Sequence, residues 1–141
     1  MSSVPFHYVD LRAFCYATED EKRVAEALRT YLPEDCELQR AESEGHYGDR
    51  IVVLSARVEN ADEVRHVLSQ VATLPDIDDV RTELDDRVDD NCSFFLTLDK
   101  QAAFGGGVER GDGITLRAKV EAYPAKRENA VANARELLAE L

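Results

Sequence analysis

Residues 4–16, VPFHYVDLRAFCY, predict one long β-strand near the start of the chain. Side chains in extended backbone point alternately to opposite sides, and this stretch separates its residues accordingly. One side carries Val9, Leu11, Ala13 and Cys15, and the other carries Phe6, Tyr8, Asp10, Arg12 and Phe14. The first set is uniformly apolar and the second is mixed, which is typical of a strand with one side against a core.

Strand and helix patterns then alternate along the chain rather than forming a repeat. The first half has a helix that ends before Pro33, strands over 37–44 and 50–58 joined by the turn 45–49, and a helix between Asn60 and Pro75. A short interrupted helix over 77–88, a strand over 93–99 and a helical turn over 100–104 follow. The chain ends with a glycine-rich loop over 105–113, a strand over 114–123 and a helix over about 127–141. The order β-α-β-β-α-(α)-β-β-α predicts a single α+β domain over residues 1–141, with a largely antiparallel sheet and helices on one face.

Three of these helices have sequence signatures where they begin. Thr18 and Glu21 fit a capping box, in which the hydroxyl accepts from the first-turn amides and the carboxylate reaches back. Asn60 with Glu63 suggests a second cap, and Asp99 a third. We therefore expect helices that begin close to these positions.

The composition is strongly acidic, with 29 Asp and Glu residues against 17 Lys and Arg residues and a net charge of −12. Only four of the basic residues are lysines. Surplus carboxylates and scarce lysine are typical of proteins from organisms with a very salty cytoplasm, because dense carboxylates hold water and counterions. The alternative is an acidic protein from an ordinary habitat.

The chain has no signature of secretion, membrane insertion or disulfide bonding. No apolar run approaches 18 residues, and the first residues lack the basic and apolar regions of a signal peptide. Cys15, Cys36 and Cys92 are widely separated and form no CxxC pair, so neither a disulfide framework nor a zinc site is indicated. We expect a cytoplasmic protein with no membrane partner.

No catalytic or metal-binding constellation stands out. The glycine run at 105–113 lacks the Lys-Ser/Thr of a phosphate-binding loop. The three histidines stand on different predicted elements, and the acidic run at 85–90 lacks the alternating ligands and glycine of an EF-hand. We therefore expect no enzyme activity, no catalytic residues, no metal and no cofactor.

The segment from Lys100 to Arg127 has the opposite charge balance from the rest of the chain. Its balance is +3, while the remaining residues sum to −15. The six basic side chains are those of Lys100, Arg110, Arg117, Lys119, Lys126 and Arg127. A protein this acidic repels nucleic acid over most of its surface, so this basic segment is where a polyanion would bind. An ordinary solvated surface is the alternative.

The predicted elements suggest how the basic segment could hold phosphates. Lys100 and Gln101 stand at a predicted helix start, where free amide donors and the helix dipole favour an anion. Arg117 and Lys119 project from one face of a strand, about 7 Å apart. Lys126 and Arg127 open the last helix, where cations are unfavourable for the dipole, so either RNA or a tertiary carboxylate would explain them.

Aromatic side chains offer stacking partners for unpaired bases. Tyr47, with His46, occupies the tip of the predicted hairpin, where the alternative is a solvated turn. Phe6, Tyr8 and Phe14 on the first strand could form a stacking platform, where the alternative is a place in the core.

Four segments of the chain resemble an archaeal family of small RNA-binding proteins that is often labelled a predicted exosome subunit. They are Ala17–Glu21, Glu44–Gly48, Leu98–Ala103 and Ala122–Glu128, and the resemblance extends over essentially the whole chain. The resemblance implies a fold like that of the large-subunit ribosomal protein that binds 5S rRNA, and an RNA-related role. Together with the acidic composition, it implies a haloarchaeal member. This chain departs from salt-sensitive members in its few lysines and in Gly105–Gly107, where a more basic loop is expected.

Two functional hypotheses follow. The first is a non-enzymatic RNA-binding protein, an accessory of RNA processing or degradation, with RNA and exosome or ribosomal components as partners. The second is a protein-interaction module that forms a homodimer or docks on a larger complex without touching RNA.

Overall fold

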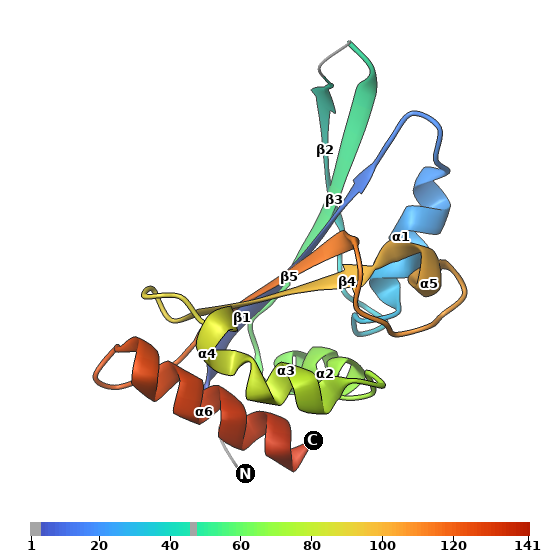
Figure 1. Cartoon of the computed structure of the whole chain (residues 1–141). Coiled ribbons are helices and arrows are strands. Elements are labelled where there is room, and N and C mark those ends of the chain that lie inside the picture. Colours follow the sequence, from blue (N-terminus) through green and yellow to red (C-terminus); the bar gives the residue numbers. More distant parts are fainter. Residues whose placement is uncertain (1–3, 46–47) are drawn as a thin grey trace.

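Five antiparallel strands form one sheet in the order β2-β3-β1-β5-β4 (Figure 1). This computed structural model describes residues 4–45 and 48–141. The strands are β1 (Phe6–Cys15), β2 (Gln39–Glu44), β3 (Arg50–Val58), β4 (Ser93–Asp99) and β5 (Gly113–Val120). The helices are α1 (Glu21–Arg29), α2 (Ala61–Val71), α3 (Ile77–Thr82), α4 (Leu84–Arg87), α5 (Lys100–Phe104) and α6 (Arg127–Glu140). The α+β class and the order of elements predicted from the sequence are confirmed.

The helices gather on one face of the sheet, as Figure 1 shows. The side chains of β1 that face them are all at most 4% exposed: Val9, Leu11, Ala13 and Cys15. They pack in one core with apolar residues of α1, α2 and α6, including Leu28, Leu68 and Leu138. We call the opposite face the open face. It is formed by the outward side chains of the strands: Tyr8, Asp10, Arg12 and Phe14 of β1, Ile51, Val53, Ser55 and Arg57 of β3, Phe95 and Thr97 of β4, Thr115, Arg117 and Lys119 of β5, and Gln39, Ala41 and Ser43 of β2.

The alternation predicted for the first strand is wrong at Phe6. Phe6 pairs with Val120 of β5 and Tyr8 pairs with the next residue, Lys119, so β1 contains one extra residue at His7. Such a bulge reverses the direction of the side chains before it. Phe6 therefore enters the core, where it is 6% exposed, instead of joining Tyr8 on the open face.

The helix starts confirm two of the three predicted caps. The Asn60 side chain accepts from the backbone N–H of Glu63 at 2.8 Å, and Asp99 accepts from that of Gln101 at 2.9 Å. The capping box at Thr18 is wrong, because Asp20 is the residue that caps α1, through the N–H of Lys22 at 3.0 Å.

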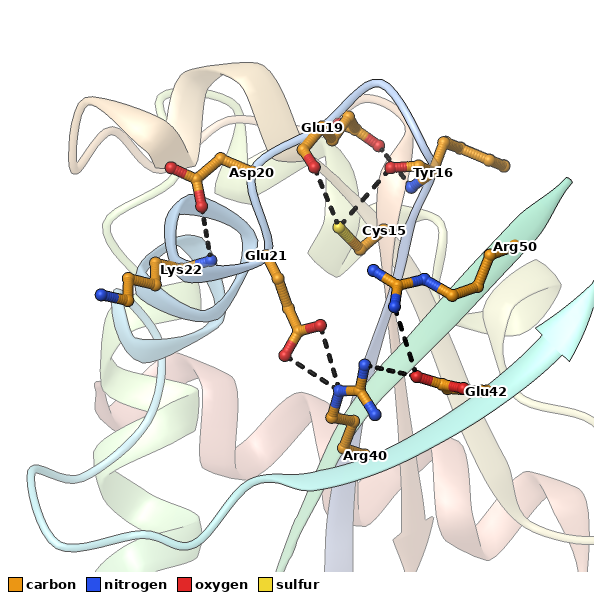
Figure 2. Close-up of polar contacts among 9 residues, drawn as sticks. All are labelled: Cys15, Tyr16, Glu19, Asp20, Glu21, Lys22, Arg40, Glu42 and Arg50. Atoms are coloured by element: carbon orange, nitrogen blue, oxygen red, sulfur yellow. Dashed lines mark hydrogen bonds and ion pairs between the residues drawn. The ribbon is translucent and has the colours of Figure 1, made fainter.

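Glu21, predicted to reach back over the helix start, instead points away from it to β2. Its carboxylate accepts from Nε of Arg40 at 3.0 Å, and Arg40 also bonds Glu42 at 2.7 Å (Figure 2). Arg50 of β3 approaches the same Glu42 oxygen at 3.5 Å. This chain of charges ties α1 to the β2-β3 hairpin on the helix-bearing side of the sheet.

Among the residues described, none of the helices is long and apolar enough to cross a lipid bilayer.

Candidate nucleic-acid interface

The strand register places four side chains in one row across the open face. Arg57 of β3 pairs with Asp10 of β1, Asp10 with Arg117 of β5, and Arg117 with Phe95 of β4. Paired residues in an antiparallel sheet share a face, with Cβ atoms about 5 Å apart. Residues that are distant in the sequence therefore form one continuous surface.

Rows on either side extend this surface. Tyr8 and Lys119 pair directly on one side of the first row. On the other side, Arg12 pairs with Ser55 and Thr115, and Phe14 lies two residues further along β1. The guanidinium carbon of Arg12 lies 5.5 Å from the centre of the Phe14 ring.

Asp10 and Arg57 form a closed pair within the open face. Nε and Nη2 of Arg57 donate to the two carboxylate oxygens of Asp10 at 2.7 and 2.9 Å. This hydrogen bonding raises the pKa of Arg57. The same guanidinium lies over the Tyr8 ring, 3.9 Å from its centre. Asp10 thus neutralises Arg57, and Arg57 covers one side of Tyr8.

The other cations of the open face are Arg12, Arg117 and Lys119. Among the described residues, the ion pairs include none made by Arg12, Arg117 or Lys119. Arg117 is exposed and lies 3.5 Å from the Tyr8 hydroxyl, and Lys119 donates to the backbone carbonyl of Asn91. The prediction that Arg117 and Lys119 project from the same strand face is confirmed. Their charge remains available to a ligand.

A groove of about 860 Å³ crosses the open face along these rows. Its lining includes Arg12, Arg57, Arg117 and Phe95. Acidic residues line it as well, and those outside the strands are Asp35, Glu37, Glu59 and Glu63. The groove therefore has a cationic floor over β1 and β5 and an acidic border formed by the segments next to β2 and β3.

Lys100 is not part of an exposed site, contrary to the prediction. Its side chain is 8% exposed, and Nζ lies 2.8 Å from Glu19 Oε1 and 2.9 Å from the carbonyl oxygen of Phe14. The amides of Gln101 and Ala102 at the start of α5 are also occupied, because both donate to Asp99. The predicted phosphate site at this helix start is thus filled by the protein's own groups.

Arg110 is likewise engaged in ion pairs within the protein. It lies 2.6 Å from Asp76 and 3.1 Å from Glu83, and 24% of its side chain is exposed. Hydrogen bonding to Asp76 raises its pKa. Arg110 therefore joins the end of β4 to α3 and α4.

The remaining predicted residues lie elsewhere. Arg127 donates from Nε to the carbonyl oxygen of Val88 at 2.8 Å, and Lys126 is exposed before the first turn of α6. α6 packs on the helix-bearing side, so these two residues do not join the open face. His46 and Tyr47 lie outside the described residues.

Sequence reasoning missed Arg12, Arg57 and Phe95 as members of a site. Alternation along each strand could have placed each of them on an outer face, since each is flanked by buried neighbours. Only the pairing of strands shows that the three share one face. Tyr8 and Phe14 of the proposed stacking platform also lie on that face.

The side chains that could hold a metal ion or act as thiols are dispersed among the described residues. Within residues 4–45 and 48–141, no three His, Cys, Asp or Glu side chains gather as a metal site would require. All three cysteines are buried free thiols, and burial raises the pKa of Cys15 and Cys36.

Comparisons with known proteins identify the family of this chain. A family model described as RNA binding matches residues 8–120, from Tyr8 in β1 to the end of β5. The RNA-binding protein PAB1135 of Pyrococcus abyssi is 34% identical over 143 residues, covering 94% of this chain and 93% of that protein. The uncharacterized protein MJ0213 of Methanocaldococcus jannaschii is 30% identical over 115 residues, covering 74% and 76%. The structure of Mth689, a DUF54 protein from Methanothermobacter thermautotrophicus, matches with a TM-score of 0.80 at 40% identity, covering 94% of this chain and 98% of that one.

Proposed function

We propose that this chain, which belongs to the RNA-binding family, is a non-enzymatic protein that holds RNA on the open face of its sheet. One observation carries the placement: within the described part of the chain, Arg12, Arg117 and Lys119 form no ion pair and lie on one face of a protein whose net charge is −12. Phosphates are repelled by most of such a surface, so a face with unneutralised cations is favoured for binding.

The spacing of the cations and the acidic border of the groove support the same placement. RNA bound along β1 and β5 contacts Arg117 and Lys119, whose spacing of about 7 Å suits contacts to separate phosphates. The acidic border around Glu37 lies at the β2-β3 side of the groove and repels the backbone there. The RNA path we propose therefore runs over β1, β5 and β4.

The proposed halophilic habitat determines which interactions matter. At about 1 M salt the Debye length is near 3 Å, so long-range attraction and counterion release contribute little. Binding then depends on short charge-assisted hydrogen bonds, for which the forked guanidinium is well suited, and on stacking. Of the open-face cations Arg12, Arg117 and Lys119, two are arginines.

The cellular role we propose is that of a cytoplasmic accessory in RNA processing or degradation, associated with the exosome or with ribosomal components. This role rests on the resemblance of the sequence to the family labelled a predicted exosome subunit. RNA held on an open sheet surface suits a protein that delivers or retains RNA for another enzyme.

The test is fluorescence-anisotropy titration of labelled single-stranded and structured RNA in molar KCl, with duplex DNA as competitor. We expect saturable binding that the double reversal R117E/K119E abolishes while the circular dichroism spectrum stays unchanged. The matched control is K22E/K126E, which makes the same charge change at two exposed lysines away from the open face. An equal loss of RNA affinity in both variants would show that binding depends on net charge and not on the open face.

Absence of RNA binding up to tens of micromolar would favour the second hypothesis, a homodimer or docking module. Light scattering would then show a concentration-independent dimer that R117E/K119E disrupts.

A further inference from the structure

Two phenylalanine rings of the open face are exposed to solvent. Phe95 is 40% exposed and Phe14 is 39% exposed, although both strands also place side chains in the core. In β4, the adjacent Phe94 is 1% exposed, so the alternation of the strand directs one ring inward and its neighbour outward. The register aligns Phe95 with Asp10 of β1, four residues from Phe14, so the two rings are separate positions on one face rather than a contiguous patch.

Each exposed ring lies beside an arginine. Phe95 pairs directly with Arg117 across the β4-β5 ladder. Phe14 has the Arg12 guanidinium 5.5 Å from its ring centre. A ring next to a cation can stack on a base while the cation contacts the phosphate of the same or the next nucleotide.

Tyr8, on the same face, differs from these two rings. The Arg57 guanidinium lies 3.9 Å from its ring centre, and Asp10 holds Arg57 there with two hydrogen bonds. One side of Tyr8 is therefore covered by the protein. Phe14 also has a guanidinium over its ring, that of Arg12, but at the longer distance of 5.5 Å. Phe95 and Phe14 are both more exposed than Tyr8, which is half-buried.

We infer that the open face is specific for single-stranded RNA, with unpaired bases stacked on Phe95 and Phe14; this inference rests on the proposed function. A base within a duplex has both faces occupied by its neighbours, so only an unpaired base can stack on a ring of the sheet. The acidic border at Glu37 adds to this preference, because the second strand of a duplex would bring further phosphates toward it. Stacking also persists in molar salt, where charge alone binds weakly.

The experiment compares three RNA probes of equal phosphate number in molar KCl: a single strand, a single strand with abasic riboses, and a hairpin duplex whose ends are joined by a linker without bases. We expect the intact single strand to bind at least about 10-fold more tightly than either of the others, from stacking of two bases. Phe95→Ala and Phe14→Ala should each weaken binding of the intact strand by about 5- to 100-fold. Neither substitution should alter binding of the abasic strand.

Two further variants are controls for structural effects of the substitutions. Phe95→Tyr keeps a stacking ring and should retain the affinity of the original protein for the intact strand. Tyr123→Ala removes a ring that is 99% exposed but lies outside the open face, and it should change nothing. Near-ultraviolet circular dichroism and thermal unfolding establish that each variant is folded.

The outcomes separate this inference from the proposed function. If the protein binds abasic and intact strands equally, and R117E/K119E still abolishes binding, the stacking inference fails and the RNA site stands. If the hairpin duplex binds as tightly as the single strand, the inference fails in the same way. If no probe binds, both fail together.

Discussion

Lys100 and Arg110 can be compared with Arg117 and Lys119, which follow them in the same basic segment. The first two are engaged in ion pairs, with Glu19 at 2.8 Å and with Asp76 at 2.6 Å. The second two lie on the open face, with no carboxylate partner among the described residues. Local charge in the sequence therefore does not distinguish cations that hold the fold together from cations that are available to a ligand.

The backbone around Lys100 explains its burial. Gly113, the first residue of β5, has φ +110°, and a Cβ there would lie 2.5 Å from Cβ of Lys100. Only glycine leaves room for the Lys100 stem to pass over this strand. The ammonium thus reaches the Phe14 carbonyl near the end of β1 and Glu19 in the connection between β1 and α1. Lys100 joins two parts of the chain that are distant in sequence.

The largest expected effect is on stability, at Lys100. Lys100→Met should lower the free energy of unfolding by about 3 kcal/mol, because it leaves the Glu19 carboxylate, 18% exposed, without its partner. Urea denaturation at fixed KCl measures this. Folded Lys100→Met protein should bind RNA as tightly as the original.

Lys126→Met is the matched control, since Lys126 is exposed and has no side-chain cap hydrogen bond. Its unfolding free energy should change by less than about 0.5 kcal/mol. If Lys100→Met reduced RNA affinity and left the free energy of unfolding unchanged, Lys100 would be a ligand-binding cation and not a structural one.

The next effect is a dependence of stability on pH through Glu19. Burial raises the pKa of this carboxyl, but the hydrogen bonds from Lys100 and the Tyr16 amide outweigh it, and the net pKa is lowered. The stabilisation is present above the unfolded pKa of about 4.3 and is lost as pH falls through the lower folded value. Acid unfolding curves of Glu19→Gln should therefore be flatter below about pH 5 than those of the original protein.

Glu42→Gln is the exposed counterpart in this measurement. Hydrogen bonding to Arg40 lowers the pKa of Glu42, but both side chains are solvated and salt screens the pair. In molar KCl, its substitution should change the acid unfolding curve less than Glu19→Gln does. An equal change would show that burial does not distinguish the two pairs.

The smallest effect concerns the acidic border of the groove. Glu37→Gln should increase RNA affinity by about 2- to 3-fold at low salt, because it removes one repulsive charge beside the cationic rows. The gain should disappear in molar KCl, where screening shortens the range of the charge. Glu140→Gln, on α6, should have no effect on anisotropy titrations at either salt concentration. A gain in both variants would indicate net charge rather than the border.

Much of the fold follows from local patterns. The order of strands and helices, the caps at Asn60 and Asp99, and the common face of Arg117 and Lys119 were predictable because each depends on neighbours within a few residues. The cap of α1 was predicted at the wrong residue, since Thr18 and Asp20 are both good capping types and only the path of the chain decides between them.

By itself, the sequence determined the α+β class, the alternation of the first strand from Tyr8 onward and of β5, and the presence of a basic segment in an acidic protein. Tertiary structure alone decided that β5 lies between β1 and β4, and this brings Arg12, Phe95 and Arg117 to one face. It also decided the bulge at His7 and the burial of Lys100. The physical reason is the sequence separation of the contacts involved. Periodicity and capping arise from contacts between residues close in sequence, whereas strand neighbours and ion pairs between distant segments arise from packing of the whole core.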